Sequence, residues 1–222
     1  MTAVALVVFA AASLTTVFPR IDGHARYSFA GSNALAAQIR QGAPADLFAA
    51  ADTKLPRRLH AAGLCSKPVV FTRNALVVVV PRSNPAHIRS VASLGRRGVK
   101  VVVAAAGVPV GDYTATVLRR LKLTRAVARN VVSREPDVRS VLAKVALGEA
   151  DAGFVYSTDA RTAKGKVRVL HLPARAQPDV EYGACVVNGS TRAAAARAFL
   201  RRLVSKTGQA RLRAAGFLPL AR

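Results

Sequence analysis

The chain has 222 residues, of which 51% are hydrophobic and only 5% aromatic, so it can bury a core within one large or two small domains. The scarcity of aromatic rings argues against nucleic-acid modules that stack bases on exposed side chains. A formal net charge of +23 favours anionic partners, but no run reaches five or six like charges, so we expect a solvated, Arg-rich surface and no nucleic-acid binding.

The first apolar segment, Ala3–Ala10, is predicted to be a buried strand. It lacks the basic region that opens a secretory signal peptide, so we expect no export signal in this chain. No segment reaches the roughly 18 uninterrupted apolar residues of a membrane helix. A short helix is expected after Ser13, and Pro19 is expected to end it early.

The rest of the chain alternates apolar, β-branched runs with helical patterns. The later strands are predicted at Tyr27–Ala30, Ala45–Ala49, Ala75–Val80, Val99–Ala104, Ala152–Tyr156, Val167–Leu172 and Cys185–Asn188. The helices are predicted at Asn33–Gln41, Lys54–Ala62, Asp112–Leu121, Val138–Leu147, Thr191–Lys206 and Gln209–Ala215. This alternation predicts an α/β fold with mainly parallel sheets that helices cover on both faces.

Several helices are predicted to begin directly after a strand, as in VFAAAS (8–13) and SFAGSNALAAQI (28–39). The N-terminus of a helix offers unpaired N–H groups and the positive end of its dipole. In open α/β sheets, ligands bind beyond the carboxyl ends of the strands. The pattern therefore predicts a cage for an anion. We expect Asp52, Asp137 and Asp159 to cap helices rather than to act in catalysis.

Motifs for phosphate loops, dinucleotides, zinc proteases and serine hydrolases are absent, and the four histidines are scattered. We therefore expect no enzyme activity, no cofactor and no cation site. The two cysteines, Cys65 and Cys185, are too few for a zinc site. A disulfide between them cannot be inferred from the sequence, which favours two buried, unpaired thiols.

An ordered set of motifs spans nearly the whole chain. It comprises FAAASLT (9–15), SFAGS (28–32), QGAPADLFAAAD (41–52), ALVVVVP (75–81), GVPVGDY (107–113), PDVRSVL (136–142), DAGFVYSTDA (151–160) and AGF (215–217). In these motifs the chain resembles the molybdate-binding proteins of ABC transporters, which are type II periplasmic solute-binding proteins. The resemblance implies two α/β lobes joined by two hinge strands, with lobe I formed by residues 1–79 and 186–222 and lobe II by residues 80–185.

The resemblance also implies the site and the partners. One tetrahedral oxyanion, molybdate or tungstate, would bind in the cleft between the lobes. Its expected ligands are the hydroxyls of Ser13, Ser32 and Tyr156 and the backbone N–H groups of Val110 and Val138. The implied protein is a monomer of the periplasm or extracytoplasmic envelope that delivers its ligand to a membrane permease. The alternatives are a binder of another oxyanion, such as sulfate or thiosulfate, and a cytoplasmic oxyanion sensor.

Overall fold

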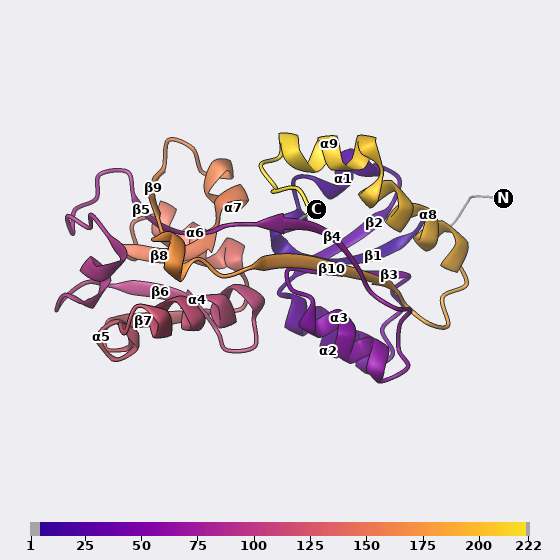
Figure 1. Cartoon of the computed structure of the whole chain (residues 1–222), viewed down its shortest axis with the longest axis horizontal. Coiled ribbons are helices and arrows are strands. Elements are labelled where there is room, and N and C mark those ends of the chain that lie inside the picture. Colours follow the sequence, from indigo (N-terminus) through magenta and orange to yellow (C-terminus); the bar gives the residue numbers. More distant parts are fainter. Residues whose placement is uncertain (1–4, 221–222) are drawn as a thin grey trace. The chain divides into compact units, whose positions relative to one another are not determined.

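The computed structural model describes residues 5–220, so the predicted start of the first strand at Ala3 lies outside the described residues. The chain divides into two compact units (Figure 1). The first unit contains the residues up to Arg73 and those from Glu181 onward, and the second is Asn74–Val180. These divisions fall a few residues before the domain boundaries predicted at 79/80 and 185/186.

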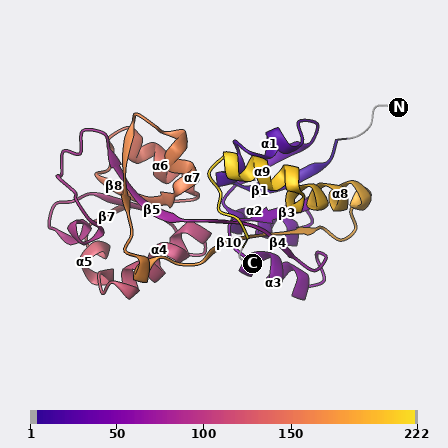
Figure 2. The same ribbon diagram turned by 45° about the horizontal axis from the view of Figure 1, so that its top comes forward.

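The first unit is built around a five-stranded sheet of order β2-β1-β3-β10-β4. Its strands are β1 (Val7–Ala11), β2 (Arg26–Ala30), β3 (Leu47–Ala50), β4 (Val69–Asn74) and β10 (Val180–Val186). Its helices are η1 (Ala12–Leu14), α1 (Phe18–Ile21), α2 (Ser32–Arg40), α3 (Lys54–Ala61), α8 (Ala193–Val204) and α9 (Lys206–Ala214). Figures 1 and 2 both show α2 and α3 on one face of this sheet and α1, α8 and α9 on the other.

The second unit repeats this plan with a sheet of order β7-β6-β8-β5-β9. Its strands are β5 (Leu76–Pro81), β6 (Val101–Ala104), β7 (Val131–Glu135), β8 (Ala152–Tyr156) and β9 (Val167–His171). Its helices are η2 (Val91–Gly95), α4 (Pro109–Arg120), α5 (Thr124–Ala128), α6 (Val138–Ala146), α7 (Ser157–Thr162) and η3 (Ala174–Ala176). Helices α4 and α5 cover one face of this sheet, and α6 and α7 the other (Figure 1).

Both sheets are mixed, with three adjacent parallel strands in each. In the first unit β1 pairs in parallel with β2 and β3, while β10 runs antiparallel to β3. In the second unit β6 pairs in parallel with β7 and β8, while β5 runs antiparallel to β8 and β9. The expected α/β class is therefore confirmed. The antiparallel strands are those through which the chain enters or leaves a unit, and the alternation of strands with helices did not show this.

One local prediction needs correction, and strand β4 was missed. Pro19 does not end a helix but lies in the first turn of α1, where its missing N–H would be unbonded in any case. Strand β4 was not predicted, because Pro68 and the polar end of the segment hide its short apolar run. By contrast, Gly63 and Gly148 follow their helices with positive φ, as expected for helix stops.

The prediction of two free thiols is wrong, because Cys65 and Cys185 form a disulfide. Cys65 follows α3, and the chain then passes through the whole second unit before it returns to Cys185 on β10. An isolated bridge between Cys65 and Val187 brings the two segments together. The sequence separation of 120 residues conceals a Cα–Cα distance of 5.9 Å, which suits a disulfide.

We expect the disulfide to stabilise the first unit, because it closes a long loop and so lowers the conformational entropy of the unfolded chain. Replacing both cysteines in Cys65→Ser/Cys185→Ser should lower the free energy of unfolding by about 2–5 kcal/mol. Chemical denaturation with and without a thiol reductant measures the effect. The reductant should destabilise the wild-type protein but not the double variant. Equal stability of the oxidised, reduced and substituted proteins would contradict the expectation.

Candidate functional site: two sets of anion donors

Ser13 and Ser32 lie at the same edge of the first sheet. Ser13 is in η1 just beyond β1, and Ser32 begins α2 just beyond β2. Because β1 and β2 are parallel and Ala11 pairs with Ala30, each serine lies two residues past the same rung of the ladder. Both side chains are buried. The structure therefore brings these two predicted ligands together within the first unit.

The Ser32 hydroxyl has a fixed orientation. Its Oγ accepts a hydrogen bond of 3.1 Å from the backbone N–H of Ala51, which directly follows β3. Since β2 and β3 flank β1, this bond crosses the end of β1 where η1 begins. A hydroxyl carries one proton and can accept as well as donate. With an N–H group already bonded to its oxygen, Ser32 keeps its own proton for another acceptor.

Ser13 has a partner that the sequence did not reveal. Its Oγ lies 2.9 Å from the hydroxyl oxygen of Tyr182, which is on β10. The two residues are 169 positions apart, and no local motif around EYGACVV (181–187) points to a site. The only available signal was a polar-tipped aromatic residue within a mainly apolar segment, since a tyrosine hydroxyl requires a hydrogen-bond partner when it is buried.

The second unit gathers the starts of three helices at one edge of its sheet. Strand β6 pairs in parallel with β7 up to Ala104 and Glu135, and β8 lies on its other side. Helices α4, α6 and α7 begin beyond β6, β7 and β8 respectively. Val110, Val138 and Tyr156 therefore meet at one edge, as predicted for strand ends in such sheets. All three residues are buried.

Val110 and Val138 are positioned by different local devices. Val110 lies in the first turn of α4, and Gly111 lets that turn press against the end of β6. A Cβ at Gly111 would overlap the carbonyl oxygen of Ala105 and lie 2.8 Å from that of Ala104. At α6, the Asp137 side chain accepts from the N–H groups of Arg139 and Ser140 at 2.7 and 3.0 Å. This confirms Asp137 as the cap and leaves the Val138 N–H to another acceptor.

Tyr156 ends β8 with its hydroxyl oxygen buried. Its ring packs edge-on against Tyr113 of α4, with centroids 6.4 Å apart. This contact holds the end of β8 beside the first half of α4.

Asp159 does not cap a helix, contrary to the prediction. It is the third residue of α7, is 1% exposed, and has Arg139 Nη1 3.9 Å from its Oδ1, beyond hydrogen-bond distance. Burial raises the pKa of Asp159 to about 7, against the lowering effect of Arg139 and with a smaller raising effect of Asp137.

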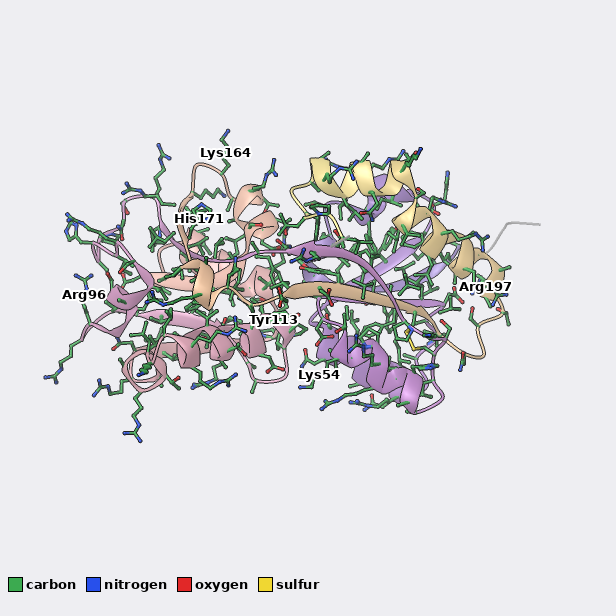
Figure 3. All side chains as sticks on the ribbon, viewed as in Figure 1. Lys54, Arg96, Tyr113, Lys164, His171 and Arg197 are labelled. Atoms are coloured by element: carbon green, nitrogen blue, oxygen red, sulfur yellow. A yellow bond between two sulfur atoms is a disulfide. The ribbon has the colours of Figure 1, made fainter. Side chains whose placement is uncertain are left out.

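The basic side chains lie mainly on the surface. Figure 3 shows Arg96, Lys164 and Arg197 projecting from the ribbon, and all three are exposed. None of the five predicted ligand positions is basic. Within residues 5–220, no group of three or more His, Cys, Asp or Glu side chains could hold a metal ion. In the same range, no helix is both long and apolar enough to cross a bilayer.

The buried Asp159 should make stability fall as pH rises. Between the unfolded pKa near 3.8 and the folded pKa of about 7, the folded state retains a proton that the unfolded state has lost. Unfolding then releases a proton, so stability decreases across this window and levels off above it. Asp159→Asn should remove this trend, so the melting temperature of the variant relative to wild type should rise from pH 4 to pH 8. The exposed Glu149→Gln is the control, and parallel pH profiles for wild type and Asp159→Asn would refute the expectation.

Known solute-binding proteins are similar to this chain in sequence and in fold. The family model described as bacterial extracellular solute-binding protein matches residues 6–218. The molybdate-binding protein ModA of Mycobacterium tuberculosis is 38% identical over 222 residues, covering 96% of this chain and 84% of that protein. ModA of Haemophilus influenzae is 32% identical over 226 residues, covering 95% and 88% respectively. The solved periplasmic molybdate-binding protein of Azotobacter vinelandii shares the fold, with a TM-score of 0.85 at 23% identity and coverage of 98% of this chain and 100% of that one. The chain therefore belongs to the bacterial extracellular solute-binding proteins, which are extracytoplasmic binding proteins and not enzymes.

Proposed function

We propose that this protein captures molybdate, or its analogue tungstate, and delivers it to the membrane permease of an ABC transporter. In this proposal one tetrahedral anion is bound by the hydroxyls of Ser13, Ser32 and Tyr156 and the backbone N–H groups of Val110 and Val138. The observation that carries it is that each unit places neutral hydrogen-bond donors at the carboxyl edge of its parallel strands. Relatives at 38% and 32% identity that bear the name molybdate-binding protein support the choice of anion.

The chemistry of the donors favours a fully ionised anion. Molybdate and tungstate are dianions without a proton at neutral pH, so every ligand oxygen can accept a hydrogen bond. Hydroxyl and backbone N–H groups can all donate to such oxygens, and no carboxylate is among the proposed ligands. A protonated phosphate would need an acceptor for its hydrogen, so this set disfavours it. Sulfate carries the same charge as molybdate but is smaller, so donors that each unit positions for the larger anion would make longer and weaker hydrogen bonds to it.

Binding and release then follow from the division of the ligands. Ser13 and Ser32 belong to the first unit, and the other three proposed ligands belong to the second. An anion that bonds to both sets favours whichever arrangement of the units permits this, and the permease can recognise that arrangement. The protein would act in the periplasm as a monomer, without a cofactor and without binding nucleic acid. The disulfide supports an oxidising, extracytoplasmic setting.

Titration calorimetry with sodium molybdate, tungstate, sulfate and phosphate tests the proposal. We expect one molybdate or tungstate per chain and much weaker binding of sulfate and phosphate. A ligand that binds only the folded state should also raise the unfolding free energy by roughly 4 kcal/mol at a thousandfold excess over Kd. Tighter binding of sulfate than of molybdate would show that sulfate, and not molybdate, is the ligand. The absence of binding and of any thermal shift with all four anions would refute an oxyanion-binding function.

The three hydroxyls can be tested one by one. Ser13→Ala, Ser32→Ala and Tyr156→Phe should each weaken molybdate binding about tenfold or more, because a hydrogen bond to a charged group contributes roughly 1.5–3 kcal/mol. Ser66→Ala is the matched control, since Ser66 also accepts a backbone N–H in the first unit, from Val186 on β10. The control should bind molybdate like wild type. Unchanged affinity in all three site variants would show that these hydroxyls are not ligands.

A further inference from the structure

Tyr182 is a fully buried tyrosine whose hydroxyl contacts one of the proposed ligands. Its side chain is 0% exposed, and its hydroxyl oxygen is 2.9 Å from Ser13 Oγ. A phenylalanine would fill the same apolar space without a polar atom. Because an unsatisfied buried hydroxyl is unfavourable, the hydroxyl makes sense here only with a defined hydrogen-bond partner.

The surroundings of Tyr182 fix the position of that hydroxyl. Its ring packs edge-on against Phe71 and Phe217, with centroids 6.1 and 5.5 Å away. The next residue, Gly183, donates its N–H to the Asp52 carbonyl oxygen at 3.1 Å. A Cβ on Gly183 would lie only 3.1 Å from that oxygen, so β10 packs closely against the turn before α3. The position of the Tyr182 hydroxyl oxygen is therefore fixed by its surroundings.

Tyr182 can give Ser13 the hydrogen-bond arrangement that Ser32 has. At Ser32 the partner is the N–H of Ala51, which can only donate, so the Ser32 proton is directed elsewhere. At Ser13 the partner is a hydroxyl, and either oxygen can be the donor. If Tyr182 donates, the Ser13 proton is directed to the anion, as at Ser32. If Ser13 donates to Tyr182, its proton is not available for a hydrogen bond to the anion.

We infer that Tyr182 is a positioning residue, which donates its hydroxyl proton to Ser13 and thereby makes Ser13 a donor to the bound oxyanion. This inference rests on the proposed function. The sequence alone could not suggest it, because the contact joins η1 to a strand that follows the entire second unit.

A double-mutant cycle on the full chain tests the inference, with molybdate affinity measured by calorimetry. Tyr182→Phe keeps the ring and should weaken binding about threefold to tenfold, the effect of one lost hydrogen bond. In the Ser13→Ala background, the same substitution should change affinity less than about twofold, because its target is gone. Tyr27→Phe is the matched control, since the Tyr27 hydroxyl bonds the carbonyl oxygens of Phe18 and Asp22 in the same unit. The control should leave affinity unchanged.

A second measurement does not depend on the folding of Tyr182→Phe. The chain has four tyrosines, so biosynthetic 3-fluorotyrosine gives few ¹⁹F signals, which Tyr27→Phe, Tyr113→Phe and Tyr156→Phe assign by elimination. Molybdate should shift the Tyr182 signal in the wild-type protein and not in Ser13→Ala. Three outcomes would overturn the inference about Tyr182 without touching the proposed function. They are wild-type molybdate affinity in Tyr182→Phe, an equal loss of affinity from Tyr182→Phe in the wild-type and Ser13→Ala backgrounds, and a molybdate-induced shift of the Tyr182 signal that persists in Ser13→Ala. A wild-type protein that binds no molybdate would overturn the proposed function as well.

Discussion

The site depends on one geometric constraint, which is that neighbouring parallel strands end at the same edge of a sheet. In each unit three such strands lie side by side, and a helix or helical turn begins beyond each central strand. The backbone then presents N–H groups that have no partner within the helix, and small or hydroxyl residues allow an anion to approach them. The proposed ligands follow from this arrangement without any charged side chain. A binding site made in this way needs only strand order, register and short connections.

The net charge of the protein and the proposed donor groups act on an anion in different ways. A net charge of +23 creates a field that attracts anions from a distance, and salt screens that field. Fixed dipoles at strand ends instead act at contact distance, where geometry decides which anion fits. The nearest basic residue to a proposed ligand in the sequence, Arg139, is engaged with Thr162 at 3.0 Å and with Asp159 at 3.9 Å. In the proposed site, attraction and selection would therefore be carried by separate groups.

Local signals accounted for most of the fold and for the strand–helix junctions at which the proposed ligands lie, while the ligands themselves were taken from the family resemblance. The strand Ala152–Tyr156 and the Asp137 cap were predicted as observed, because short apolar runs and N-cap residues act over a few positions. Strand β4 and the place of Pro19 were misjudged for local reasons, but the missed features that bear on the site are set by long-range contacts. The Cys65–Cys185 disulfide and the Ser13–Tyr182 hydrogen bond span 120 and 169 residues. The burial of Asp159 was missed for the same reason, since its surroundings come from α6 as well as from its own helix.

The two segments in which the chain passes between the units also make hydrogen bonds close to the proposed ligands. The chain leaves the first unit at Asn74, whose side-chain Nδ2 donates to Thr158 Oγ1 at 2.8 Å and whose Oδ1 accepts from the Ser157 hydroxyl at 2.9 Å. Those two residues directly follow Tyr156. The chain returns at Glu181, and the next residue, Tyr182, bonds Ser13. Each passage is thus hydrogen-bonded to a segment that bears a proposed ligand. In the proposed site, a change in backbone geometry at either passage would alter the position of a donor, and an anion that fixes the donors would restrain both passages. The proposed ligand binding would in this way be linked to the geometry of each passage within its own unit.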